Sequence, residues 1–270
     1  MLGETPAGSP VPQTSPPLVP LPGPKPWSWR DLILFLASAG LAQVAANLLV
    51  LAGYLGLQPA LGWQTPPQAL RHNTFFLLVL QVVFYGLVVG YVYLLVVAGY
   101  RQPFWAALRW HKPTTRHALL FFLGGTLLCV VVGLAPRVLP DREDFPLLRL
   151  FSSPPAAYAL AAFAVFLAPF MEELIFRGVL FRFFENLVGI RFAVVSTAVL
   201  FAGLHLPEYW GAWNHVLLIS LVGVVFSLAR GLTGSLAPSV ILHIAYNTGL
   251  MVAFFFETHQ FRALGGAALF

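Results

Sequence analysis

Long apolar runs dominate this chain, and short polar stretches separate them. A helix needs about 20 mainly apolar residues to cross a bilayer, and seven runs reach or nearly reach that length. They are Asp31–Leu57, Phe75–Gly99, His117–Pro136, Pro155–Asn186, Arg191–Leu206, Trp213–Arg230 and Leu236–Phe256. The pattern predicts an all-α polytopic membrane bundle of about seven transmembrane helices.

The composition supports a membrane protein. Hydrophobic residues make up 59% of the 270 residues and charged residues only 9%, whereas a soluble domain carries about 25% charged residues. A soluble chain this apolar would expose large apolar patches and aggregate. The single cysteine, Cys129, cannot form an intrachain disulfide, and we expect it to be a small buried side chain.

The positions of the basic residues predict an orientation. The net charge is +5, and most Lys and Arg residues lie between the apolar runs. With a cytoplasmic N-terminus, nine Lys and Arg residues fall on the cytoplasmic side and five on the opposite side; Arg177 is not counted because it lies within an apolar run. Because cytoplasmic loops of membrane proteins are enriched in Lys and Arg, we expect the N-terminus in the cytoplasm. This bias explains the positive charge better than a nucleic-acid partner does, and we predict no such partner.

Two adjacent carboxylates interrupt the fourth run, and an arginine follows. They are Glu172, Glu173 and Arg177. Charges in hydrocarbon are costly and usually functional. Neighbours on a helix point about 100° apart, whereas residues four apart meet. We therefore expect Glu173 and Arg177 to form a structural ion pair, and Glu172 to be free to act as a general base. The alternative, two solvated acids at a helix end, fits the apolar flanks less well.

A histidine in the fifth run is expected at the depth of these acids. A turn at Gly189 would fold the fourth and fifth runs into an antiparallel hairpin. Glu173 lies 16 residues before this glycine (189 − 173), and His205 lies 16 after it (205 − 189). Alone, His205 would be read as a packed or interfacial histidine. At the same depth as the acids, and with Phe201 one turn before it, His205 becomes a candidate partner for the base.

The last run carries a second polar pair, His243 and Asn247, which share one helix face. An amide in the middle of a membrane helix is costly unless it is paired. Hydrogen bonding between helices would explain both side chains. In combination with the other motifs, a shared acid/base site inside the membrane is the favoured interpretation.

These motifs together resemble the CPBP family, the CAAX-processing type II endoproteases and their bacteriocin-processing relatives, also called the Abi family. The order Glu-Glu-x-x-x-Arg, Phe-x-x-x-His and His-x-x-x-Asn extends over residues 155–256. The resemblance implies an intramembrane endopeptidase that hydrolyses membrane-associated, for example prenylated CAAX-like, proteins or peptides. It also implies that Glu172 with His205 activates water, and that His243 and Asn247 stabilise the oxyanion.

The resemblance also bears on cofactors, partners and location. The family is often labelled metalloprotease, and Glu172, His205 and His243 are candidate ligands for one divalent ion such as zinc. Metal-dependent and metal-free mechanisms both remain open. The expected partners are the lipid bilayer and a hydrophobic or lipidated peptide. We expect a multi-pass protein of the plasma (inner) membrane of a prokaryote.

Two other functional classes stay open. One is a non-enzymatic bacteriocin-immunity or scaffold membrane protein with a repurposed site. The other is a proton-coupled transporter, because Glu and His also form proton relays in membranes, although transporters more often show internal repeats.

Four regions are expected along the chain. They are a disordered proline-rich tail over 1–30, N-terminal transmembrane helices over 31–150, a catalytic helical core over 155–256 and a C-terminal tail over 257–270.

Overall fold

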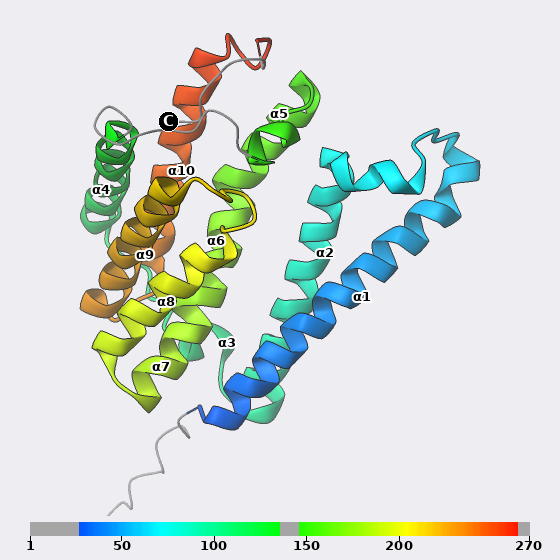
Figure 1. Ribbon diagram of the computed structural model, residues 1–270. Helices are drawn as coiled ribbons and strands as arrows, with labels where there is room; N and C mark the ends of the chain where they lie inside the picture. The colour runs from blue at the N-terminus through cyan, green and yellow to red at the C-terminus, as the bar shows by residue number, and fades with distance from the viewer. Residues whose placement is uncertain (1–26, 136–145, 264–270) are drawn as a thin grey trace, which may run out of the picture.

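The computed structural model describes residues 27–135 and 146–263 and confirms the all-α bundle (Figure 1). Within those residues six helical segments are long and apolar enough to cross a membrane. They are α1 (Trp29–Leu61), α2 (Thr74–Tyr93, continued by a π-helical segment over Leu94–Gly99), α4 (Thr115–Gly133), the continuous segment Pro154–Leu187, α9 (Trp213–Thr233) and α10 (Ala237–Glu257). The fifth predicted run is the shorter α8 (Ile190–Leu204). Most of the predicted N-terminal tail and half of the C-terminal tail lie outside the described residues.

The fourth spanning segment alternates between α- and π-helical turns. Its parts are α5 (Pro154–Ala162), a π segment over Phe163–Leu167, α6 (Ala168–Glu173), a π segment over Leu174–Leu180 and α7 (Phe181–Leu187). π-helical turns are rare and often occur at functional sites. The two acids end α6, so they lie directly before the second π segment.

Three short helices join the spans within residues 27–135 and 146–263, and the sequence pattern did not predict them. They are η1 (Pro67–His72) between α1 and α2, α3 (Phe104–Ala107) after α2, and η4 (Pro146–Leu150) before α5. Each has no more than six residues, which is too short for an apolar periodicity to be recognised.

Polar caps determine where several helices begin. The Ser28 side chain accepts a hydrogen bond from the Asp31 N–H, and the Asp31 carboxylate accepts one from the Ser28 N–H. This reciprocal arrangement is a capping box. Asn73, Thr114 and Ser153 cap α2, α4 and α5 through one side-chain oxygen each. Because a helix start leaves backbone donors unsatisfied, these residues fix the boundaries of the apolar runs.

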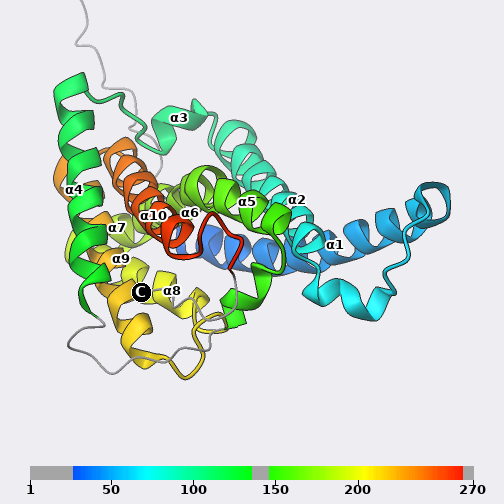
Figure 2. The ribbon, with the colours of Figure 1, turned by 90° about the horizontal axis from the view of Figure 1, so that it is seen from above.

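The helices form one bundle with a diverging hairpin at its side. Figure 1 and Figure 2 show α10 between α4 and the segment that contains α6, with α7, α8 and α9 beside them, while α1 leans outward from α2. Antiparallel α7 and α8 meet at Gly189, whose φ of 112° favours glycine. The predicted turn at this position is therefore present.

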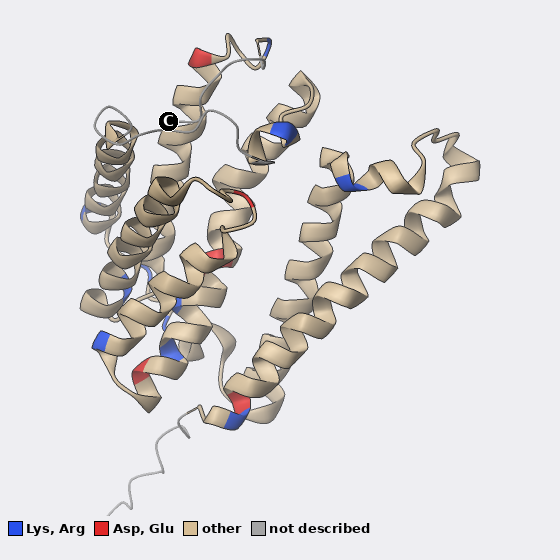
Figure 3. Cartoon of the chain, in the orientation of Figure 1, with Lys and Arg blue, Asp and Glu red and all other residues tan. Residues whose placement is uncertain are grey.

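The outer surface of the bundle is apolar. Leu41 on α1 is 72% exposed and Leu232 on α9 is 84% exposed. In water such side chains would favour aggregation, but in a bilayer they contact acyl chains. Figure 3 shows few charged positions along the helices of the bundle.

A glycine allows α4 to lie directly against α10. A Cβ added at Gly125 would overlap the carbonyl oxygen of Leu242 and lie 2.8 Å from the Ala245 Cβ. Small residues at helix contacts are common in membrane bundles because they let backbones approach closely. Gly125→Ala is expected to lower the free energy of unfolding by about 1–3 kcal/mol. The measurement is the thermal unfolding midpoint of the purified protein in detergent.

Gly90 on α2 provides the matched control. Nothing lies within 4 Å of a Cβ added there, so Gly90→Ala should leave the unfolding midpoint unchanged or raise it slightly, because alanine favours helix. A Gly125→Ala midpoint equal to that of Gly90→Ala would contradict the close α4–α10 contact.

Candidate active site

One cavity of about 330 Å³ collects the polar residues singled out from the sequence. Glu172, His205, His243 and Asn247 all line it, together with Phe201. These side chains come from α6, the C-terminal end of α8, and α10. The cavity extends from the middle of the fourth spanning segment to Thr74, Leu147 and Leu150, which lie where α2 begins and in η4.

Glu173 and Arg177 form the predicted ion pair in the protein interior. Both side chains are fully buried, and Arg177 Nη1 lies 2.8 Å from Glu173 Oε1. Arg177 Nη2 donates to the Gly223 carbonyl at 2.8 Å, and Arg177 Nε donates to Ser227 Oγ at 3.3 Å. The Phe201 ring centroid lies 4.7 Å from the guanidinium carbon. These contacts join α6, the second π segment, α8 and α9, so the pair fixes the geometry beside the cavity.

His243 lies between the two acids. Its Nδ1 is 3.0 Å from Glu173 Oε1, and its Nε2 is 3.8 Å from Glu172 Oε2. An ionised carboxylate can only accept hydrogen bonds, so Nδ1 carries the hydrogen in this contact. The geometry therefore assigns Nε2 as the atom that faces the cavity side. Nε2 can donate to an oxyanion only when the ring is protonated.

His205 is oriented by the backbone of its own helix. Its Nδ1 lies 2.8 Å from the Phe201 carbonyl oxygen, which can only accept, so this nitrogen carries the hydrogen. In the neutral ring Nε2 then has a free lone pair that can accept a hydrogen bond from water. His205 is the C-cap residue of α8, and Pro207, which follows closely, cannot continue the helix.

Asn247 has a structural partner as well as access to the cavity. Its Nδ2 donates to the Ala164 carbonyl at 2.8 Å. In a π turn this carbonyl would bond to residue 169, but Pro169 has no N–H, and the Ala168 N–H bonds to Phe163. Asn247 therefore satisfies a carbonyl that the proline leaves without a backbone donor. Its second N–H and its Oδ1 remain available.

Tyr85 is a site residue that the sequence patterns did not reveal. Its hydroxyl lies 3.4 Å from Glu172 Oε1, and its side chain is almost completely buried. Tyr85 belongs to α2, far from the other site residues in sequence. Glu172 thus has no partner on its own helix, as predicted, but two from other helices, Tyr85 and His243. The only signal in the sequence was polar Gln81 one turn earlier on the same face of an apolar helix, which also lines the cavity.

A third carboxylate, Glu208, lines the cavity from the loop after α8. Although the residue is exposed at the surface, nearby protein removes part of its hydration and raises its pKa above the ordinary value. The His205 charge opposes this shift, and the Glu172 charge adds to it. Glu208 therefore holds a proton to higher pH than an isolated glutamate.

The candidate metal ligands do not form a ready-made metal site. In the part of the chain that the structure describes, no group of three His, Cys, Asp or Glu side chains is arranged to hold a metal ion. His243 Nδ1 is already engaged by Glu173. Metal binding by Glu172, His205 and His243 stays a prediction, and no mechanistic step is derived through a metal.

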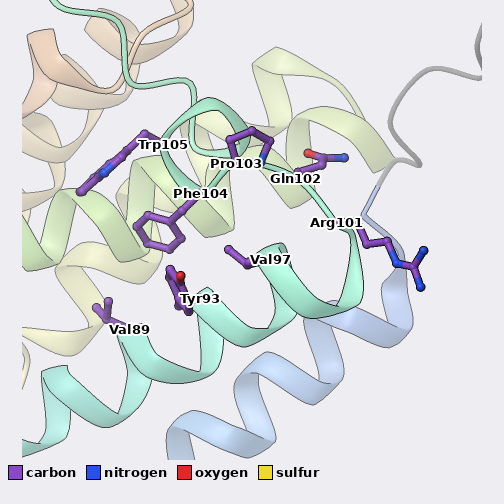
Figure 4. Close-up of a pocket in the computed structure, with 8 residues that line it drawn as sticks. All are labelled: Val89, Tyr93, Val97, Arg101, Gln102, Pro103, Phe104 and Trp105. Atoms are coloured by element: carbon purple, nitrogen blue, oxygen red, sulfur yellow. The ribbon is translucent and has the colours of Figure 1, made fainter.

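A larger pocket of about 710 Å³ lies elsewhere, against α2 and the segment that leads to α3 (Figure 4). Its walls are mainly apolar and aromatic, with Tyr93 and Phe104 in ring contact at 5.6 Å. Arg101 is its only ionisable wall residue apart from the tyrosine. Among the described residues, its wall contains neither an acid nor a histidine, so this pocket lacks a group that could activate water for hydrolysis.

Comparison with known proteins gives one match. Residues 154–249 match the family model described as type II CAAX prenyl endopeptidase Rce1-like. The matched segment contains every acid, histidine and amide predicted for the site, but Tyr85 lies outside it. No curated protein and no solved structure matches the chain. The chain is an integral multi-pass membrane protein, and its residues 154–249 are similar to the Rce1-like type II CAAX prenyl endopeptidases.

Proposed function

We propose that this protein is an intramembrane endopeptidase that hydrolyses peptide bonds in membrane-tethered or hydrophobic peptides, including lipidated ones. The observation that carries the proposal is that Glu172 and His205, from different helices, line one cavity in a membrane bundle. His243 and Asn247 line the same cavity from a third helix. An acid and two histidines can supply a general base, and a histidine and an amide can supply hydrogen-bond donors to an oxyanion, so these groups are suited to amide hydrolysis.

Glu172 is the proposed general base. The exposed fraction of its side chain is 20%, so water in the cavity can reach it, and it is not neutralised by Arg177, which pairs with Glu173. Glu172 takes a proton from water while the resulting hydroxide attacks the carbonyl carbon. His205 orients the water through its free Nε2. When the C–N bond breaks, the proton on Glu172 passes to the leaving amine.

His243 and Asn247 are the proposed stabilisers of the oxyanion. Asn247 retains one N–H beyond its bond to Ala164. His243 contributes a donor through Nε2 when its ring is protonated. Glu173 holds Nδ1 at 3.0 Å, so the ring is oriented before substrate binds. Donors fixed in advance stabilise a developing charge without the cost of reorganisation.

Location and orientation follow the same proposal. Counted along the sequence, nine Lys and Arg residues fall on the side of the N-terminus and five on the opposite side. We place the N-terminus in the cytoplasm on this bias and the protein in the inner membrane of a prokaryote.

Cleavage of tethered peptides tests the proposal. Purified protein in lipid nanodiscs is incubated with a library of membrane-tethered peptides, prenylated and unprenylated, in water enriched in ¹⁸O. Mass spectrometry should find shortened peptides with one ¹⁸O atom in the new carboxylate, and Glu172→Gln serves as the control. Folded wild-type protein that cleaves no peptide would favour the immunity or scaffold protein, or the transporter.

Tyr85 is expected to hold Glu172 in position. A hydrogen bond to a charged group contributes about 1.5–3 kcal/mol, and the 3.4 Å separation places this contact at the weak end. Tyr85→Phe should therefore lower kcat about 10-fold with little change in KM. The measurement is steady-state cleavage of the most efficiently cleaved peptide over a range of peptide concentrations, which gives kcat and KM separately.

Tyr246 provides the control for that variant. It lines the same cavity, but its hydroxyl makes no hydrogen bond to either glutamate within the described residues. Tyr246→Phe should leave kcat unchanged. Equal effects of the two substitutions would contradict a specific role for the Tyr85 hydroxyl.

A further inference from the structure

Three arginines and one glutamate gather at the end of the bundle where α1 begins. Arg109 follows α3, Arg182 and Glu185 lie on α7, and Arg230 lies on α9. Arg109 Nη1 forms an ion pair with Glu185 Oε2 at 3.1 Å, and Arg182 and Arg230 interact electrostatically with both of these residues. Figure 3 shows basic positions around the lower ends of α7 and α9. Three positive charges thus share one negative charge.

Several of these donors lack an acceptor. The Arg230 side chain is fully buried, and its Nε donates to the Arg177 carbonyl at 3.1 Å. Its Nη1 and Nη2 have no hydrogen-bond partner among the described residues, and the same holds for Nε and Nη1 of Arg182. A buried guanidinium without acceptors is strongly destabilising unless an anion compensates it.

Two simpler explanations leave these donors unexplained. Cations near helix C-termini can bind the last carbonyls, but none of the four nitrogens named above donates to a carbonyl. The positive-inside bias also places arginines at this end, but such residues normally reach water, whereas Arg230 does not.

We propose that Arg109, Arg182 and Arg230 form a binding site for a phosphate group, either of an anionic phospholipid headgroup or of free phosphate. Guanidinium groups bind phosphate oxygens through paired N–H donors. The Arg109 side chain is 35% exposed, so it provides the first contact. The unpaired Arg182 and Arg230 nitrogens are buried in this structure. Binding therefore requires the Arg182 side chain to rotate so that its guanidinium faces the anion. The site lies at the depth of lipid headgroups, at one end of the spans.

Thermal unfolding in nanodiscs of different lipids tests the site. Replacing part of the phosphatidylcholine by phosphatidylglycerol should raise the unfolding midpoint of the wild-type protein, because a ligand that binds only the folded state stabilises it. The double variant Arg109→Gln/Arg182→Gln should lose this rise. Arg116→Gln/Arg191→Gln removes the same charge from exposed positions at the same end and should keep it.

A second series of unfolding measurements distinguishes a lipid headgroup from free phosphate as the ligand. Inorganic phosphate added to phosphatidylcholine nanodiscs should raise the midpoint if free phosphate is a ligand, and a rise with phosphatidylglycerol alone assigns the site to the lipid. No rise in either series, or the same rise in both double variants, would overturn the proposal. Native mass spectrometry of the wild-type protein, counting phosphatidylglycerol retained after detergent removal, gives a readout that does not depend on a variant that folds.

Discussion

Glu172→Gln is expected to slow peptide hydrolysis by roughly 10²- to 10⁴-fold, the usual contribution of a general base, while the bundle stays folded. Glutamine keeps the size of the side chain and can still accept a hydrogen bond from Tyr85, but it cannot take a proton from water. Glu172 is not part of the buried ion pair, so the fold does not depend on its charge. Two quantities are measured on the same sample. They are the cleavage rate of the tethered peptide that the wild-type protein cleaves fastest, and the thermal unfolding midpoint.

Glu208→Gln is the matched control, because it removes a second carboxylate from the same cavity. Its effect on the cleavage rate should stay within a few-fold, since Glu208 lies in the surface loop. Full activity of Glu172→Gln, or an equal loss in both variants, would refute the assignment of the base.

Glu173→Gln should have its largest effect on stability. Removing one partner of a buried ion pair leaves an uncompensated charge and costs about 3–5 kcal/mol, and both Glu173 and Arg177 are fully buried. The substitution also weakens the bond that holds His243 Nδ1. A large drop in the unfolding midpoint, or loss of folded protein during purification, is therefore expected.

A double variant separates charge burial from other effects. Glu173→Gln/Arg177→Met removes both charges and should recover part of the lost stability, because an apolar replacement of a buried pair is often nearly neutral. The coupling is read from the double-mutant cycle of unfolding free energies. A Glu173→Gln protein with wild-type stability and no activity would show instead that Glu173 acts in the reaction.

The membrane spans and the Glu173–Arg177 ion pair could be predicted because each depends on residue spacing within one helix. The apolar runs predicted the membrane helices to within a few residues, and the four-residue separation of Glu173 and Arg177 predicted their contact. The turn at Gly189 correctly predicted the hairpin that carries His205 toward the acids.

Contacts between distant helices could not be predicted in the same way. Nothing in the α2 sequence indicates that Tyr85 faces Glu172, because periodicity gives the face of a helix but not its neighbour. The partner of Asn247 depends on the π segment over Phe163–Leu167, just before Pro169, which spacing rules based on 3.6 residues do not anticipate. The arginine cluster could not be predicted for a related reason, since Arg109, Arg182 and Arg230 are each typical of an ordinary loop or helix end in the sequence.

The direction of the cavity determines which peptides in the cell are accessible to cleavage. Because the cavity extends to Thr74 and Leu150, the proposed endopeptidase would receive a scissile bond from the surface opposite the start of α1. With the proposed cytoplasmic N-terminus, that surface would face away from the cytoplasm, and we expect secreted or outward-tethered peptides as substrates. The topology of the proposed endopeptidase therefore also determines the compartment from which its substrates come.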